Sequence, residues 1–262
     1  MKRYAQIWLA QMRYSLTRDM MFKINFLAWI IVDLTWFSLQ LCFVRVLYLN
    51  VDTVAGWSKW EMVLLIATSN LIQQIFQGLF VNAFIGFPEM IRTGKLDFFL
   101  AQPAPTQFLV STRLFGMDSV INSLVAFSLV LFAAHQYSGA WPISGLAAYF
   151  ALVMLGVIMN YSLLLTTVTL AFWMTRAQGL ISSYYQLFQL ARIPRQAFRG
   201  AFKFIFTWML PYLLVANVPA RTLLHGLRWR EAGALLAVTT CLVVVSNLFF
   251  NFGLKRYSSA SS

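Results

Sequence analysis

The stretch GFPEMIRTGKLDFFLAQPAPTQ, residues 86–107, decides how this chain is organised, because it is a polar island between two long apolar segments. Its charged residues and prolines are typical of a short structured element that faces water. The segments on either side have the length and composition of membrane spans. The pattern predicts a membrane protein that offers one compact element, hereafter the island, to a soluble partner.

The composition of the whole chain supports this interpretation. Of its 262 residues, 60% are hydrophobic and 11% are charged, whereas soluble domains carry roughly a quarter charged residues. The formal charge of +12 fits the Lys and Arg excess on the cytoplasmic loops of a bacterial inner-membrane protein. Nucleic-acid binding would need the basic residues gathered with aromatic residues on one soluble surface. They are instead scattered over the loops, so we expect no nucleic-acid partner.

Six apolar segments predict an all-α integral membrane protein that forms a single transmembrane domain over residues 1–262. Residues 1–23 combine an apolar and a basic face, which predicts an amphipathic helix in the membrane interface. Positive charge near both ends of the chain places both termini in the cytoplasm, and the island follows them there. The expected spans are 24–46, 61–85, 114–134, 143–173, 177–192 and 232–254.

The segment before the last span allows two topologies. In the first, 177–192 is the fifth span, and 200–222 is a re-entrant pair of short helices on the outer side, broken by prolines. In the second, 177–199 lies on the cytoplasmic surface and 203–224 is the fifth span. The positive-inside rule favours the second, because it places four basic residues in the cytoplasm. These are Arg192, Arg195, Arg199 and Lys203.

Motifs of catalysis and of metal or nucleotide binding are missing from the sequence. No GxxxxGK[ST] loop occurs, because Gly94-Lys95 is followed by Leu96. The two histidines stand alone, and no set of His, Cys, Asp and Glu has the spacing of a metal site. We therefore expect a chain that is not an enzyme and holds no cofactor of its own.

Within the island, the residue types predict two short helical turns. Pro88 suits the first turn of a helix, Glu89 interacts favourably with its dipole, and Gly94 can close it in a left-handed conformation. A second turn follows over 95–102. Its apolar side and flanking charges are Leu96, Phe99 and Leu100, with Lys95 and Asp97. Such a knob fits a groove on a partner; a loop helix that only anchors the island at the membrane fits the same pattern.

Polar residues inside the expected spans are candidates for a transport path. Asp33 is the only acidic residue deep in a clear span, and a carboxylate in lipid is costly enough to suggest a function. The alternative is a structural role, with Asp33 hydrogen-bonded to a neighbouring helix or facing a wet cavity. One face of the second span carries amides that should point into a helix bundle or a water-containing path. These are Asn70, Gln73, Gln74 and Gln77.

Over nearly its whole length, the chain resembles the permease subunits of ABC-2-type transporters. The resemblance depends most on a motif in the island, and a second stretch and the order of the segments support it. The motif is Glu89-x-x-Arg92-x-Gly94-x-Leu96-Asp97 with Pro103 behind it, and the second stretch runs from Arg192 through Pro194 to Pro211 and Pro219-Ala220.

The resemblance implies a permease of six spans that pairs with an identical or related permease chain. In this family the island contains a coupling helix that docks on a separate ABC ATPase dimer, which binds ATP and Mg²⁺. A re-entrant pair before the last span is also implied, so the resemblance favours the first topology. Export of a lipid-like, glycan or amphiphilic substrate is the expected activity. By position, the coupling residues would be Glu89, Arg92, Gly94, Lys95, Leu96 and Asp97.

Two other functional classes fit the sequence. A self-sufficient channel or ion-coupled carrier would depend on Asp33 and would need no ATPase. A non-transporting membrane scaffold would use the island only to recruit a soluble protein.

Overall fold

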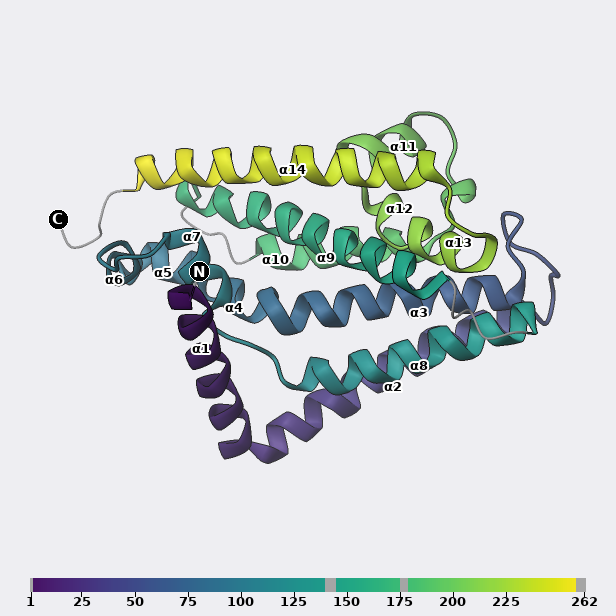
Figure 1. Ribbon diagram of the computed structural model, residues 1–262, viewed down its shortest axis with the longest axis horizontal. Helices are drawn as coiled ribbons and strands as arrows, with labels where there is room; N and C mark the ends of the chain where they lie inside the picture. Colours follow the sequence, from purple (N-terminus) through teal and green to yellow (C-terminus); the bar gives the residue numbers. More distant parts are fainter. Residues whose placement is uncertain (1, 140–144, 175–178, 258–262) are drawn as a thin grey trace.

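The computed structural model describes residues 2–139, 145–174 and 179–257. The chain is 83% helical, and the described residues form no β-strand. The expected all-α fold is therefore confirmed. The two ends of the described chain lie at the same end of an elongated helix bundle (Figure 1).

Among the described residues, five helices are long and apolar enough to cross a membrane. The second of these, Lys59–Arg92, is a continuous run of shorter elements. Its parts are α3 (Lys59–Phe76), the π-helical turn η1 (Gln77–Val81), α4 (Asn82–Ile85) and α5 (Phe87–Arg92). The other four are α2 (Lys23–Leu47), α8 (Asp118–Ser138), α9 (Leu146–Thr169), which continues into η3 (Leu170–Phe172), and α14 (Trp229–Arg256).

The bundle has an inner and an outer set of helices. Most of α3 and α9 is buried inside the protein, whereas α2, α8 and α14 are mainly exposed. α3 packs most extensively on α8, and α9 on α14. The outer helices expose large apolar side chains such as Ile24, Phe43 and Leu248. A belt of this kind would be unfavourable in water and suits contact with lipid.

The segment before α14 is bent rather than straight. It contains α11 (Gly200–Phe204), the π-helical turn η6 (Ile205–Met209), α12 (Tyr212–Val215) and α13 (Asn217–His225). The parts Gly200–Met209 and Tyr212–His225 meet at 71°, and they form a sixth span if they are counted as one. Pro211 lies at the break, where its ring interrupts helical hydrogen bonding.

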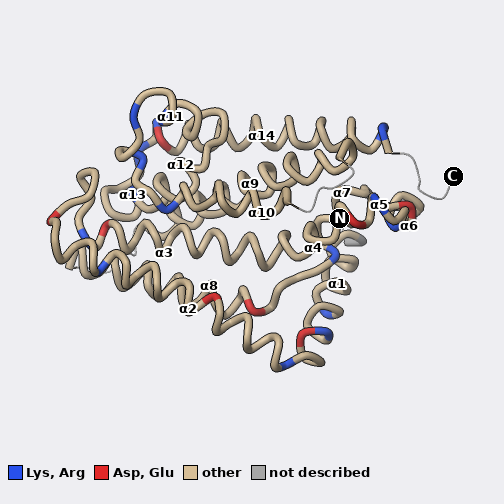
Figure 2. Tube along the Cα trace, turned by 180° about the vertical axis from the view of Figure 1, so that it is seen from behind, with Lys and Arg blue, Asp and Glu red and all other residues tan. Residues whose placement is uncertain are grey.

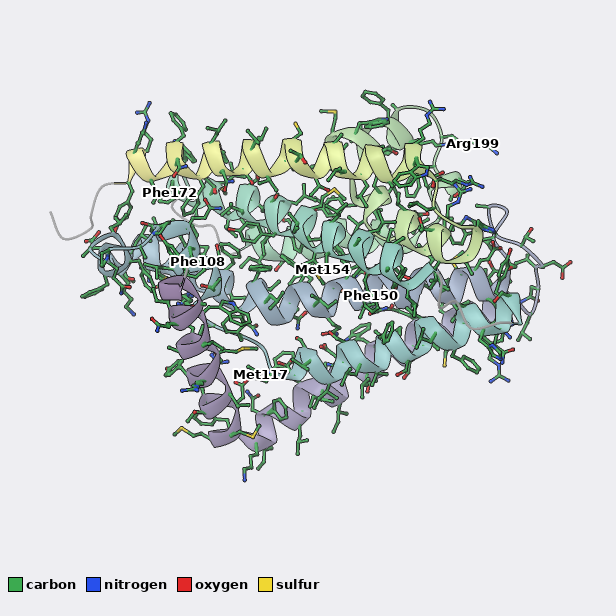
Figure 3. The ribbon with its side chains drawn as sticks, in the orientation of Figure 1. Phe108, Met117, Phe150, Met154, Phe172 and Arg199 are labelled. Atoms are coloured by element: carbon green, nitrogen blue, oxygen red, sulfur yellow. The ribbon has the colours of Figure 1, made fainter. Side chains whose placement is uncertain are left out.

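The residues just before this bent segment and the last residue of it lie beside the start of α3. The indole Nε1 of Trp57 donates a hydrogen bond to Oε1 of Gln196 at 3.1 Å. Nε2 of His225 lies 3.1 Å from Oε1 of Glu61. A segment that leaves and returns at one end of the bundle has the geometry of a re-entrant pair. Figure 3 shows Arg199 at this end and Phe108, which follows the island, at the other.

This geometry favours the first of the two topologies. The chain is at the island end at Phe172, whose ring packs on Phe87, and at the opposite end at Gln196. The described residues 173–174 and 179–196 therefore lie between the two ends, as the first topology expects. The second topology, which keeps 177–199 at the island end, would need Gln196 at that end, so its contact with Trp57 is evidence against that topology.

The helix in that passage is shorter than the expected span 177–192. It consists of α10 (Gly179–Phe188) and the 3-10 turn η4 (Gln189–Arg192), followed by η5 (Arg195–Ala197). At 1.5 Å per residue, the ten residues of α10 rise only about 15 Å, half of the roughly 30 Å hydrocarbon layer. Non-helical backbone is tolerated at this depth because it lies against protein; α10 packs on α9, and η4 packs on α3 and α12.

Candidate functional site

The island forms two short helices and leads into a third. α5 (Phe87–Arg92) begins with Pro88 in its first turn, and α6 (Asp97–Leu100) follows. Between them, Gly94 has φ +72°, which a residue with a side chain rarely adopts. The backbone N–H of Leu96 then donates to the carbonyl of Met90 at 3.2 Å. α7 (Thr106–Thr112) completes the segment.

An exposed ion pair covers the first helix of the island. Nε and NH2 of Arg92 donate to the two carboxylate oxygens of Glu89 at 2.9 and 2.6 Å. This hydrogen bonding lowers the pKa of Glu89 and raises the pKa of Arg92. Both groups are therefore charged at neutral pH, and Lys95 is exposed beside them. The island presents fixed charges of both signs to a partner.

The apolar edge of the island differs from the expected one. Leu96 is completely buried in the hydrophobic core, and Phe99 packs partly against it. The exposed apolar side chains are Phe98, which is 73% exposed, and Leu100, which is 43% exposed. The sequence pattern missed Phe98 because a helix of four residues is too short for its periodicity to define a face.

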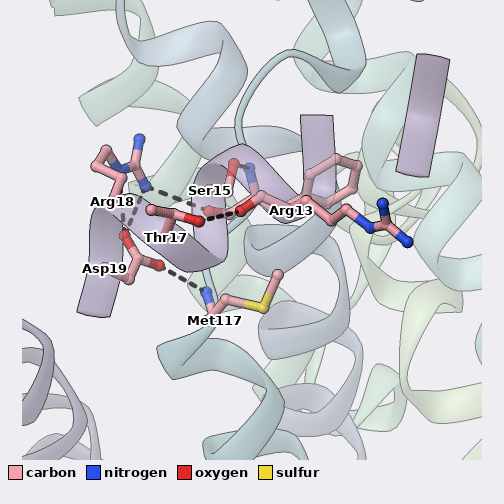
Figure 4. Close-up of polar contacts among 7 residues, drawn as sticks. Arg13, Ser15, Thr17, Arg18, Asp19 and Met117 are labelled. Atoms are coloured by element: carbon pink, nitrogen blue, oxygen red, sulfur yellow. Dashed lines mark hydrogen bonds and ion pairs between the residues drawn. The ribbon is translucent and has the colours of Figure 1, made fainter. Parts of the chain in front are cut away.

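The N-terminal helix α1 (Lys2–Met21) is bound to the segment that follows the island (Figure 4). The backbone N–H of Phe115 donates to Oγ of Ser15 at 3.0 Å, and that of Met117 donates to Oδ2 of Asp19 at 3.3 Å. NH2 of Arg18 donates to the carbonyl of Phe115 at 3.3 Å. These bonds fasten the C-terminal half of α1 to the connection between the island and α8.

A cavity of about 1060 Å³ lies between these elements and the inner helices. It is walled by α1 and α2 on one side and by α3, α4, the start of α8, α10 and η4 on the other. The five path candidates predicted from the sequence all line it. They are Asp33, Asn70, Gln73, Gln74 and Gln77.

Asp33 is held by two neighbouring helices. Its Oδ2 accepts hydrogen bonds from Nε2 of Gln74 on α3 at 3.1 Å and from Nδ2 of Asn122 on α8 at 3.2 Å. This arrangement combines both parts of the structural alternative, since the carboxylate is hydrogen-bonded to other helices and also faces a cavity. The carboxylate therefore helps to hold α2 against α3 and α8.

Arg192 is a cavity residue that sequence reasoning did not assign to this site. Its NH2 donates to Oε1 of Gln73 at 2.6 Å, and its NH1 donates to Oε1 of Gln189 at 2.6 Å. The sequence grouped Arg192 with three other basic residues on one surface. The structure separates it from Arg199, which is exposed. The helical spacing of Tyr185, Gln189 and Arg192, which all line the cavity, was the available signal.

One face of α2 adds an aromatic wall to the cavity. Phe22, Phe26, Trp29 and Trp36 all line it at helical spacing. Trp29 and Trp36 are also 54% and 64% exposed, so the wall continues to the outer surface of the bundle. The cavity is thus polar along α3 and η4 and apolar along α2.

Metal binding has no support in the described part of the chain, where no three His, Cys, Asp or Glu side chains gather closely enough to hold an ion.

Comparison with known proteins identifies a family. The sequence model of the family described as "ABC-2 family transporter protein" matches residues 34–261. The match includes the island and most of the residues that line the cavity. No curated protein and no solved structure matches the chain.

Proposed function

The chain belongs to the ABC-2 family of transporter proteins and is a multi-pass membrane permease, and we propose that it is the export permease for a lipid-like or amphiphilic substrate. A separate ABC ATPase dimer supplies the energy and holds ATP and Mg²⁺, while this chain holds no cofactor. A second permease, identical or related, completes the transporter. The proposed location is the bacterial inner membrane, with both termini and the island in the cytoplasm.

One observation carries the proposal: a single helical run contributes residues both to the wall of the cavity and to the island. Lys59–Arg92 includes Gln73, Gln74 and Gln77 in the wall of the cavity and Glu89 and Arg92 in the island. A displacement of α5 by a partner is therefore carried along backbone hydrogen bonds to the cavity wall. This supports a coupling role for the island over simple anchoring of a loop.

A second connection supports the same role. α1 is hydrogen-bonded to Phe115 and Met117, which follow the island, and it continues at Phe22 into α2. α2 forms the opposite wall of the cavity. Motion of the island therefore reaches both walls, through α4 on one side and through α1 on the other. We propose that closure of the ATPase dimer moves the walls apart and opens the cavity outward.

The island offers a partner two kinds of contact. Phe98 and Leu100 form its exposed apolar edge, and Glu89, Arg92 and Lys95 provide charges around it. Gly94 shapes the turn between the helices, and the buried Leu96 fixes the second helix to the core. We therefore assign docking to the exposed residues and support to Gly94 and Leu96.

The test is co-purification of the tagged protein in mild detergent, followed by identification of the bound chains and assay of ATP hydrolysis. We expect a P-loop ATPase with the wild type. It should be lost in the double variant Phe98→Ala with Arg92→Glu, and retained in Phe202→Ala, where an equally exposed aromatic residue is removed at the opposite end. An ATPase that stays bound and coupled in the double variant would refute docking at the island. A homo-oligomer that transports without any ATPase would favour the channel or carrier.

A further inference from the structure

The guanidinium of Arg192 lies in the cavity wall among neutral groups. Its three hydrogen-bond acceptors are amide oxygens, those of Gln73 and Gln189 at 2.6 Å and that of Asn70 at 3.5 Å. Within the described residues, no carboxylate lies within ion-pair distance of it. Its Nε is buried and makes no hydrogen bond to the described residues.

Such an arrangement is costly unless something balances the charge. An arginine stays charged at any physiological pH, so it cannot relieve the cost by losing its proton. Amide oxygens satisfy its N–H groups only in part, and charges at membrane depth usually pair with an opposite charge or line a pathway. Arg192 therefore brings to the cavity a positive charge that no carboxylate of the described residues balances.

The other charged residues that line the cavity are Arg18, Asp19, Asp33, Arg113 and Asp118, and none of them forms an ion pair with Arg192. Arg18 and Asp19 form an ion pair at 2.9 Å. Nε of Arg113 donates to the carbonyl of Ala83 at 3.0 Å. Asp33 accepts from two amides. Asp33 and Arg192 are bound to adjacent residues of α3, Gln74 and Gln73, rather than to each other. The charge of Arg192 is thus not used in an internal salt bridge and is available to an anion in the cavity.

An apolar wall accompanies this anion site. Phe26, Trp29 and Trp36 line the same cavity on α2, and the two tryptophans reach the outer surface of the bundle. A ligand with an acyl or alkyl chain can lay the chain along this wall with its head group at Arg192. Phosphate and carboxylate both match the donor geometry of a guanidinium.

We propose that the cavity binds an amphiphile with an anionic head group, phosphate or carboxylate, and that Arg192 is the residue that binds the anion. The proposal rests on the transport function argued above and adds the chemical class of the substrate. The anion displaces none of the bonds that hold Asp33, because Asp33 is fixed by Gln74 and Asn122.

The test uses the permease purified in dodecyl maltoside and titrated with decyl phosphate, with binding read from the shift of the melting temperature. Decyltrimethylammonium and inorganic phosphate are the matched probes, the first with the opposite charge and the second without a chain. We expect only decyl phosphate to stabilise the wild type. Equal stabilisation by decyltrimethylammonium would overturn the anion assignment, and equal stabilisation by inorganic phosphate would overturn the amphiphile.

Two variants of the same cavity separate charge from shape. Arg192→Gln should weaken decyl phosphate binding roughly tenfold or more, because the charge-assisted hydrogen bonds are lost. Asp33→Asn removes a negative charge from the same cavity and should tighten the binding of decyl phosphate. Arg199→Gln, at an exposed arginine outside the cavity, is the control and should bind as the wild type does. Wild-type binding in Arg192→Gln, or an equal loss in Asp33→Asn, would overturn the proposal.

A second variant and a cross-linking measurement cover two other outcomes of this test. If Arg192→Gln does not fold, Arg192→Lys retains the charge and should still bind decyl phosphate, and failure to bind would count against the proposal. If Arg192→Gln instead changes the fraction of cross-linked dimer while binding stays at the wild-type level, Arg192 meets a carboxylate of a second copy and the proposal is wrong. Co-purification of the ATPase with these variants tests the transport function separately, because the island is unchanged in them.

Discussion

The side chains of Trp57 and Gln196, 139 positions apart in the sequence, are joined by a hydrogen bond of 3.1 Å. Trp57 belongs to the connection between α2 and α3, so this bond holds the basic segment that includes Arg195 and Arg199 at the end of the bundle opposite to the island. Figure 2 shows basic residues gathered at both ends. With the island in the cytoplasm, as proposed, this segment departs from the positive-inside rule, which weighs charge and contains no information on tertiary contacts.

Cysteine labelling tests this arrangement in the intact membrane. Arg199→Cys should react with a membrane-impermeant maleimide from the same side as Asp52→Cys, and Lys95→Cys only from the other side. The native Cys42 and Cys241 lie in α2 and α14, on surfaces assigned to lipid, and should remain unlabelled until the protein is denatured. Labelling of Arg199→Cys from the side of Lys95→Cys would contradict the fold.

The close approach of α9 to the inner elements predicts a sensitive glycine. A Cβ at Gly156 would lie 3.1 Å from Cδ1 of Ile72 and 3.2 Å from the carbonyl oxygen of Val215. Gly156→Ala should therefore lower the free energy of unfolding by about 1–3 kcal/mol through overpacking, measured by unfolding in sodium dodecyl sulfate followed by circular dichroism. At Gly233, where no atom lies within 4 Å of the added Cβ, Gly233→Ala serves as the control and should not destabilise the protein.

Asp33 should contribute to stability through its two amide partners. Asp33→Ala leaves Nε2 of Gln74 and Nδ2 of Asn122 without their acceptor, and the unfolding free energy should fall by roughly 1–3 kcal/mol. Thr35→Ala is a suitable comparison, because the Thr35 hydroxyl bonds only to the carbonyl of Ile31 in its own helix. Equal stability of the two variants would show that the Asp33 network does not hold α2 to the bundle.

Neighbouring residues of the island should respond to substitution in opposite ways. Leu96→Ala removes a fully buried side chain and should cost about 2–5 kcal/mol of stability. Phe98→Ala removes a mostly exposed one, so its melting temperature should stay near that of the wild type while ATPase binding falls. A stable Leu96→Ala variant, or a Phe98→Ala variant that unfolds, would contradict the packing of the island.

The Glu89–Arg92 pair predicts how docking depends on pH. Because Arg92 lowers the pKa of Glu89, the stabilisation from this pair is present above the unfolded-state pKa and is lost as the pH falls through the lower folded-state pKa. Between pH 6 and 8 the pair is fully ionised, so ATPase binding should not vary because of it. Glu89→Gln, which has no charge to lose, should bind with the same pH profile over this range. A drop in wild-type binding over this range that is absent from Glu89→Gln would show that the pair titrates there.

Much of the architecture was predictable from residue patterns. The long apolar segments matched α2, α3, α8, α9 and α14 because a span in lipid needs a long apolar helix with internally satisfied backbone groups. Gly94 was predicted to adopt a left-handed conformation, and it does so with φ +72°. Local chemistry determines features of this kind, so they can be inferred without tertiary contacts.

The parts that depend on tertiary contacts were harder to predict. The amide face of α3 indicated a cavity wall, but it did not reveal Arg192 as part of that wall, because η4 is placed by packing against α3 and α12. The burial of Leu96 and the exposure of Phe98 likewise depend on where the core lies. The bonds from α1 to Phe115 and Met117 join backbone to short polar side chains and leave no periodic signal in the sequence.

The π-helical turn η1 has a consequence for the phase of the helix that contains it. The residues of this helix that line the cavity are Asn70, Gln73, Gln74 and Gln77, then Asn82 and Ile85, so the step from Gln77 to Asn82 is five residues. A π-turn absorbs that step by admitting one extra residue. If the same residues closed as a regular α-helix, with none removed, everything that follows would rotate by about 100° about the helix axis. Asn82 would then leave the cavity, and α5 would turn a different side outward, so the one extra residue of the π-turn sets the angular alignment between the cavity and the island.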